Sequence, residues 1–333
     1  MGMPNVITHG LMAQETLKQL PVSTVRSAIE HFEQAFLFGS NGPDFLFYYN
    51  VWPWLNQKEA ARISDFGEII HRQKINEFTD TMIDLAYQLP KGKKQDIALA
   101  FIAGYLTHWS LDSVAHPFIF YRSGEMKGST RYWHYRYESM LDSLMVTRVF
   151  ELKLQDVPSK KFVKLSKMER ETIAWIVSTA VYKVYGTVLT QQEAMTCMKH
   201  FYQVLHALFD PKTRLFPVVQ WVENHLMRKP WNFSSHMVIG DLDEVHDILN
   251  EHREAWCNPT DPSEIHHDSF MQLFDQALGR ATLALSQLNH IGMKKAVSMA
   301  PVMQDRQFDT GKSEDRPMII YDSVYEKSGN LAR

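Results

Sequence analysis

The sequence predicts an all-α protein, and three observations indicate it. Apolar residues recur at helical intervals along most of the 333-residue chain. Strand signals are almost absent, and only residues 318–321 look extended. The chain has 15 glycines, fewer than the share of about 7% that is usual in proteins. Low glycine disfavours a loop-rich β fold and a glycine-cradled nucleotide site.

The helices are predicted one after another from this spacing. Ile7, Leu11, Leu17 and Leu20 recur at helical intervals, and the pattern continues after Pro21 until a polar, glycine-bearing turn at 39–43. An aromatic run at 44–50 follows, which we interpret as core packing, with the wall of a binding site as the alternative. The last long helix is expected to open with Asp261 and Pro262 as cap and first turn. The predicted helices span 7–20, 22–38, 65–89, 96–120, 133–154, 169–189, 191–209, 217–227, 242–256 and 262–289.

Charge, cysteine content and the termini exclude several classes of protein. The 35 basic and 38 acidic side chains give a net charge of −3, and no basic run exceeds Lys91–Lys94. The electrostatic signature of a dedicated duplex binder is therefore missing. Two cysteines are too few for a disulfide framework. The first residues have no signal-peptide pattern and no long apolar window follows, so we expect a cytoplasmic protein without a transmembrane segment.

One helix carries a pattern that indicates metal chemistry. His108, Asp112 and His116 lie at i, i+4 and i+8 and therefore project from one helical face. The preceding residues 98–106 are almost wholly apolar, so this face should be buried. Burying a carboxylate between two imidazoles costs several kcal/mol unless a cation compensates. A metal ion held by these side chains is the simplest explanation, and the ligand types suit zinc.

Further histidines and carboxylates occur on other predicted elements. His134 and Glu138 form another i, i+4 pair, His71 lies on an upstream helix, Asp44 follows a turn, and His9 is near the N-terminus. Taken singly, each has an ordinary structural explanation.

Together, these residues resemble the zinc-dependent phospholipase C family, which is related to the fungal zinc nucleases that cut single-stranded nucleic acid. The family pattern is an early His, an Asp in a turn, a helical His, His-x-x-x-Asp, a nearby His and His-x-x-x-Glu. This sequence matches it over about residues 4–150, at His9, Asp44, His71, His108, Asp112, His116, His134 and Glu138.

The resemblance implies a phospholipase C/nuclease-like helical bundle, with additional C-terminal helices and an irregular tail, that binds two or three zinc ions. One ion would be held by Asp44, His71, His108 and Asp112, and Asp112 would bridge to a second ion at His9. A third would be held by His116, His134 and Glu138. In the secreted phospholipases an N-terminal tryptophan completes one site. No tryptophan precedes His9 here, so that site uses another amine, uses another side chain, or stays empty.

The implied activity is hydrolysis of a phosphodiester by metal-bound hydroxide, with release of a phosphomonoester. Asp44 and Asp112 are the implied catalytic residues, and Asp44 would orient or deprotonate the attacking water. The expected partner is a small phosphodiester or a phospholipid head group, with transient membrane contact and no stable nucleic-acid complex. The alternatives are a nuclease or nucleotide phosphodiesterase on the same metal site, and a non-catalytic helical protein that metal ions stabilise.

The length favours about two domains, or one large domain with a tail. We expect residues 1–157 to form the metal-binding catalytic region and 158–290 to form a second helical half packed on it. The break at Pro158–Lys161 marks the boundary between them. Residues 291–333 are predicted to be an irregular, loosely packed extension.

Overall fold

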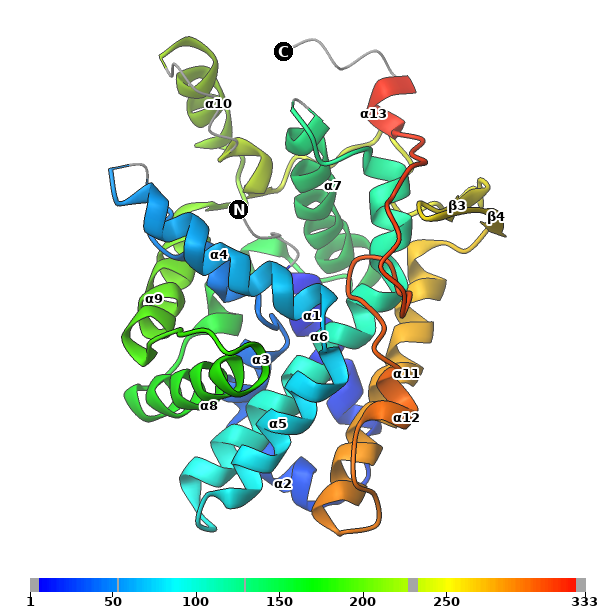
Figure 1. Ribbon diagram of the computed structural model, residues 1–333. Helices are drawn as coiled ribbons and strands as arrows, with labels where there is room; N and C mark the ends of the chain where they lie inside the picture. Colours follow the sequence, from blue (N-terminus) through cyan, green and yellow to red (C-terminus); the bar gives the residue numbers. More distant parts are fainter. Residues whose placement is uncertain (1–5, 53, 129, 227–232, 328–333) are drawn as a thin grey trace.

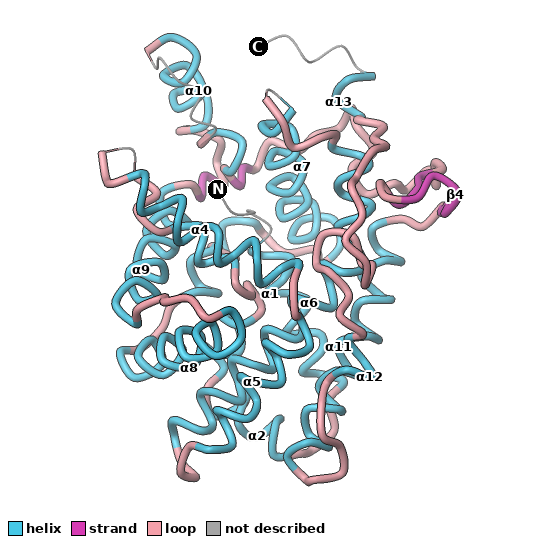
Figure 2. Tube along the Cα trace, in the orientation of Figure 1, coloured by secondary structure: helices cyan, strands magenta, loops and turns pink. Residues whose placement is uncertain are grey.

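The computed structural model confirms the all-α prediction and describes residues 6–52, 54–128, 130–226 and 233–327. The described strands form two short pairs, and Figure 2 shows one of them projecting at the edge of the helical body. The helices are α1 (Val6–Gln19), α2 (Thr24–His31), α3 (Glu33–Gly39), α4 (Gln57–Arg72), α5 (Ile75–Gln88), α6 (Lys93–Ser123), α7 (Thr130–Leu144), α8 (Lys167–Tyr185), α9 (Gln191–Ala207), α10 (Phe216–His225), α11 (Phe270–Gly292), α12 (Ala300–Met303) and α13 (Val324–Lys327). Short helices are η1 (Asp44–Tyr48), η2 (Met145–Val149), η3 (Leu154–Asp156), η4 (Ser159–Val163) and η5 (Ser234–His236).

The strands are β1 (Phe209–Asp210), parallel to β2 (Val238–Ile239), and β3 (Trp256–Asn258), antiparallel to β4 (Asp261–His266). None of the described helices is both long and apolar enough to cross a membrane.

Helix α6 is the centre of the fold. It has 31 residues, and from Ile97 onward nearly all of them are buried. A helix that is apolar on every side needs neighbours on every side, and α1, α2, α3, α5, α7, α8 and α11 all pack on it. Figure 1 shows α6 running through the molecule with α11 beside it.

Two glycines permit the closest helix contact. A Cβ atom on Gly104 of α6 would lie 2.0 Å from the carbonyl oxygen of Phe36 on α3. A Cβ atom on Gly39 of α3 would lie 2.2 Å from the carbonyl oxygen of Phe101. The two backbones therefore touch at a distance that no larger residue allows, which draws the segment after α3 toward α6.

The predicted helix 65–89 is two helices, α4 and α5. Lys74 lies between them with φ of 53°, in the left-handed region. Contacts from the end of α8 fix this break, because Lys74 Nζ donates to the Val184 carbonyl and the Tyr185 hydroxyl donates to the Gln73 carbonyl. The predicted helix 22–38 is likewise divided at Phe32, and 133–154 ends as α7 at Leu144 and continues as η2.

The predicted helix 242–256 is wrong. Asp243 accepts hydrogen bonds from the backbone of Val245 and His246, and Asp247 accepts from the backbone of Glu251 and His252. Such side-chain acceptors compete with helical hydrogen bonding and favour turns.

The predicted start of the last long helix is also wrong. Residues 261–266 form β4, and the Asp261 side chain accepts from the backbone of Ser263. Helix α11 begins after Ser269, which forms a capping box with Gln272. The side-chain cap therefore lies eight residues further along the chain than the sequence pattern indicated.

The C-terminal segment is irregular as predicted, but it is not loosely packed. Met299, Met303 and Phe308 are fully buried. Trp109 Nε1 donates to the Arg306 carbonyl over 2.9 Å, and the Phe308 backbone N–H donates to the His71 carbonyl over 3.1 Å. In Figure 1 the segment after α12 crosses α6, and these contacts fasten it there. The sequence did not reveal this packing, because the buried apolar residues of the segment are too widely spaced to show a helical or strand period.

Replacing Gly104 by alanine should destabilise the protein, because the added methyl group meets the α3 backbone. Overpacking of this kind costs about 1–3 kcal/mol, and urea unfolding followed by circular dichroism would measure it. Gly279→Ala is the matched control, since a Cβ atom there meets nothing within 4 Å. It should stabilise α11 by about 0.5–1 kcal/mol. Equal stability of Gly104→Ala and the unmodified protein would contradict the packing argument.

Candidate metal centre

Asp112 is the hub of a buried cluster on α6. Its side chain is 1% exposed and lies among three imidazoles. Oδ1 is 3.1 Å from His9 Nε2 and 3.3 Å from His116 Nε2, and Oδ2 is 3.1 Å from His108 Nε2. The side chains of 108, 112 and 116 thus lie together as predicted, and α1 adds His9, whose ring centroid is 4.3 Å from that of His108. His9, His108 and Asp112 offer ligand atoms that all lie within 4.8 Å of one another.

A second group lies beside the first. Asp44 Oδ1, on η1, is 3.0 Å from His71 Nε2 and 3.7 Å from His108 Nε2. The ligand atoms of Asp44, His71 and His108 also lie within 4.8 Å of one another. Gly42, with φ of 45°, makes this approach possible, because a Cβ atom there would lie 2.0 Å from His108 Cδ2. The two groups share His108 and are therefore adjacent.

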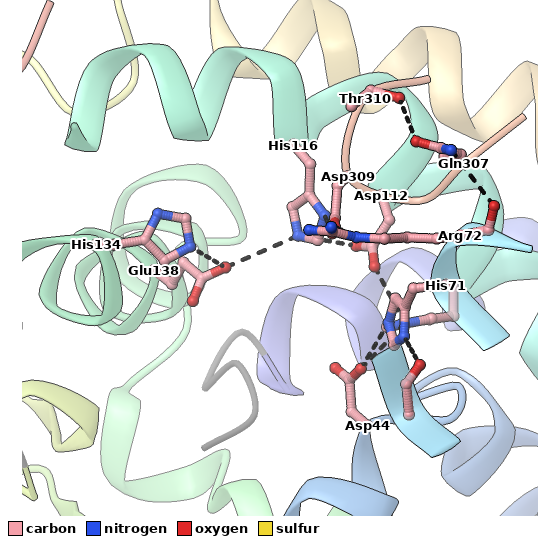
Figure 3. A network of polar contacts seen from close by, with 12 residues as sticks. Asp44, His71, Arg72, Asp112, His116, His134, Glu138, Gln307, Asp309 and Thr310 are labelled. Atoms are coloured by element: carbon pink, nitrogen blue, oxygen red, sulfur yellow. Dashed lines mark hydrogen bonds and ion pairs between the residues drawn. The ribbon is translucent and has the colours of Figure 1, made fainter. Parts of the chain in front are cut away.

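The third predicted set is more open. Glu138 Oε1, on α7, is 3.8 Å from His116 Nε2 and 3.6 Å from His134 Nε2. Figure 3 shows the carboxylate of Glu138 between the two rings. These three residues are not among the groups within the described part of the chain whose ligand atoms all come within 4.8 Å. All eight predicted residues are thus in one buried cluster, with Glu138 linking its outer pair.

Neighbouring atoms fix the orientation of two of the rings. His71 Nδ1 lies 2.6 Å from the Gly67 carbonyl oxygen. Because a carbonyl only accepts, Nδ1 carries a proton, and Nε2 is the ring nitrogen that faces Asp44. His134 Nδ1 lies 2.7 Å from Ser123 Oγ. Partners of this kind set the tautomer and direction of metal-binding histidines.

Burial keeps most of the imidazoles neutral. It lowers the pKa of His9 to about 4 and that of His134 to about 3. Burial also lowers the pKa of His108 well below its ordinary value, and that of His116 in the same direction. A neutral imidazole has a free lone pair, which is the state that binds metal.

The remaining groups hold protons when no cation is present. Burial raises the pKa of Asp112 to about 8, with the nearby Asp44 acting in the same direction. Burial likewise raises the pKa of Glu138 well above its ordinary value. For His71 burial alone would lower the pKa, but the hydrogen bond and negative charge of Asp44 raise it to about 9. Ionisation of Asp112 and Glu138 is thus unfavourable in this buried cluster unless a cation binds there.

The polar atoms that face into the cluster are suited to bind a cation. They are buried and have no hydrogen-bond partner of good geometry among the described residues, although oppositely charged atoms approach them. These atoms are Asp44 Oδ1, His71 Nε2, His108 Nε2, both oxygens of Asp112, His116 Nε2, His134 Nε2 and both oxygens of Glu138. Buried polar atoms are normally satisfied, so this set is best explained as ligands of cations. Imidazole nitrogen with carboxylate oxygen is a donor set that zinc accepts.

Two carboxylates at this centre were missed in the sequence. Asp142 is fully buried and accepts hydrogen bonds from the backbone of Ile7 and Thr8 and from the Thr8 hydroxyl. It thereby ties the start of α1 to α7, and its place one turn after Glu138 was an available signal. Asp309 Oδ1 lies 3.9 Å from His116 Nδ1. No spacing links Asp309 to the other residues, because the chain folds back over a long distance to bring it there.

A cavity of about 490 Å³ opens beside the cluster. His71 and Asp309 lie in its wall, together with Phe47, Phe120 and Tyr135. The aromatic run 44–50 therefore has both roles considered for it, because Phe45 and Tyr48 are buried while Phe47 lines the cavity. The prediction that another amine completes the site at His9 concerns residues 1–5, which lie outside the described part of the chain.

The comparisons with known proteins agree with this arrangement. Residues 8–183 match the family model described as zinc dependent phospholipase C. The match covers more than half of the chain and includes all eight residues of the cluster. Searches of curated proteins and of solved structures gave no match. On the strength of the family match, the chain belongs to the zinc-dependent phospholipase C family.

Proposed function

We propose that the protein is a zinc-dependent phosphodiester hydrolase of the phospholipase C type, which releases a phosphomonoester from a small phosphodiester or a phospholipid head group. The observation that carries this proposal is Asp112, buried between His9, His108 and His116 next to a cavity. Membership of the family supports the same activity.

The residues that would hold the ions follow from the two close groups. Asp44, His71 and His108 would hold one zinc ion, with Asp112 between it and a second at His9. His116, His134 and Glu138 would hold a third. When bound, a pair of zinc ions lowers the pKa of water and stabilises negative charge on a phosphoryl group.

Asp44 is the proposed proton acceptor. Its carboxylate is 4% exposed and is held by His71, which is itself fixed by the Gly67 carbonyl. A general base needs a defined position within hydrogen-bond reach of the proton that it removes. Asp44 meets the first condition through these contacts, and on η1 it lies three residues before Phe47, which lines the cavity.

The cavity suits a head group. Its volume of about 490 Å³ falls in the range of small-molecule sites, about 300–1,000 Å³. Phe47, Phe120 and Tyr135 supply aromatic surfaces, and Glu68 and Glu125 supply carboxylates. Aromatic rings with acidic groups bind quaternary ammonium groups such as choline, so a phosphocholine ester is the first substrate to test.

Metal analysis tests the ligand assignment. The protein prepared with zinc should contain at least two ions per chain, and Asp112→Asn should lose most of them, because an amide is a poor bridging ligand. Inductively coupled plasma mass spectrometry after gel filtration would measure the content. Asp275→Asn, an exposed position on α11, is the control and should keep its metal. Full metal content in Asp112→Asn would rule out the bridging role.

Hydrolysis assays test the substrate class. A chromogenic phosphocholine ester should be cleaved, chelator should abolish the activity, and zinc should restore it. Asp44→Asn should lower kcat by about 100-fold or more, as loss of a general base does. A dinucleotide is the second arm. Cleavage of the dinucleotide alone would favour the nuclease alternative, and bound zinc without turnover of either would favour a structural role for the metal.

Zinc binding should release protons at pH 7. Without metal, Asp112 has a pKa of about 8 and His71 of about 9, so both are mostly protonated and must lose their protons to bind zinc. Affinity should therefore fall as the pH is lowered from 8 to 6. Calorimetry in buffers with different ionisation enthalpies would count the protons, and Asp112→Asn should release fewer. A binding heat that is independent of the buffer would contradict this.

A further inference from the structure

The C-terminal segment lies against the metal centre although it is outside the residues that match the family. It places Asp309, which is 9% exposed, beside His116 on α6. Asp309 and Thr310 also line the cavity, as do Arg316 and Tyr321 further along the segment. The part of the chain without a family match therefore forms one wall of the candidate site.

The two oxygens of Asp309 face different partners. Oδ2 lies 3.1 Å from both Nε and Nη2 of Arg72, at the end of α4. The other oxygen, Oδ1, faces His116 and lies 3.9 Å from its Nδ1. Figure 3 shows the guanidinium of Arg72, the carboxylate of Asp309 and the ring of His116 next to one another.

His116 differs from His71 and His134 in the environment of its Nδ1 atom. His71 Nδ1 and His134 Nδ1 each have a partner within 2.7 Å, the Gly67 carbonyl and Ser123 Oγ respectively. His116 Nδ1 is buried and has no hydrogen-bond partner among the described residues. Asp309 is the carboxylate that faces this nitrogen.

We propose that Asp309 is a positioning residue of the metal centre, which orients His116 through Nδ1 and is itself held by Arg72. This inference rests on the proposed zinc site. The separation of 3.9 Å is about 1 Å longer than a hydrogen bond. The proposal therefore includes closure of this gap when His116 Nε2 binds the metal.

The backbone around Asp309 is fixed well enough for this task. Phe308 donates its N–H to the His71 carbonyl, and its ring centroid lies 4.7 Å from that of His71. Gln307 Nε2 donates to the Arg72 carbonyl. Gly311 closes the turn with φ of 63°, and a Cβ atom there would lie 2.3 Å from the Ser113 carbonyl oxygen. Only glycine permits this approach to α6, so the carboxylate is held by packing on both sides.

The chemical consequence follows from the position of His116. Its Nε2 lies between Asp112 Oδ1, at 3.3 Å, and Glu138 Oε1, at 3.8 Å, and so joins the two parts of the cluster. A carboxylate that accepts the Nδ1 proton selects the tautomer with a free Nε2 lone pair and raises its basicity. The Arg72 guanidinium holds Oδ2 of the carboxylate and leaves Oδ1 on the side of the ring. Asp309 thus acts on zinc through His116 without touching the ion.

Zinc affinity tests the proposal. Asp309→Asn should weaken the zinc bound at His116 by about 10–100-fold, the usual effect of losing such a partner. Competition with a chromophoric chelator would measure this. Asp315→Asn is the matched control, because Asp315 is exposed, lies on the same segment and lines the same cavity. It should leave zinc affinity unchanged.

Stability separates a positioning role from a structural one. Thermal unfolding of the chelator-treated protein should be nearly the same for Asp309→Asn and the unmodified chain, whereas the zinc-loaded forms should differ. If Asp309→Asn does not fold, Arg72→Gln serves instead, because the Arg72 side chain is 54% exposed. It should lower zinc affinity by a smaller factor, since Asp309 remains but is no longer held.

The outcomes are distinct from those for the proposed function. An unmodified protein that binds no zinc overturns both proposals. A protein that binds and uses zinc, with unchanged affinity in Asp309→Asn, overturns the positioning role alone. A loss of affinity that is matched by equal destabilisation of the metal-free protein shows a structural role and also overturns it.

Discussion

The burial of Asp112 between imidazoles is the constraint on which the rest of the structure depends. An ionised carboxylate that is 1% exposed loses several kcal/mol of hydration unless it is compensated. The neighbouring His9, His108 and His116 are held neutral by the same burial. A cation held by these side chains would supply the compensation, and such a site requires that the surrounding helices exclude water and leave the ligand atoms turned inward.

The packing around α6 meets both requirements. Helices on all sides keep water out, and several of them bring one polar group each to the same point. The glycine contact between α3 and α6 draws the following η1 inward, and Gly42 lets Asp44 reach His108. Asp142 ties the start of α1 to α7 and thereby places His9. The helical shell and the site are consequences of the same close contacts.

The sequence predicted those features that depend on local spacing. His108, Asp112 and His116 were found because one helix face repeats every 3.6 residues, and the fold class followed from the same period. His9, Asp44 and His71 come from separate elements and were assigned through the family pattern. The segment 242–256 was predicted to be helical because its apolar spacing was right, but side-chain acceptors on Asp243 and Asp247 favour turns instead. Asp309 had no period to reveal it.

The position of Asp309 changes how the chain should be divided by function. The eight candidate ligands lie within residues 8–183, which match the family. The wall of the cavity also uses Arg316 and Tyr321, which lie outside that match. Metal chemistry depends on ligands whose geometry tolerates little change, whereas a substrate is recognised by whatever lines the entrance. We infer that the family-matching region supplies the candidate ligands and the aromatic wall of the cavity, and that the C-terminal segment contributes the remaining wall and can therefore influence which substrate enters.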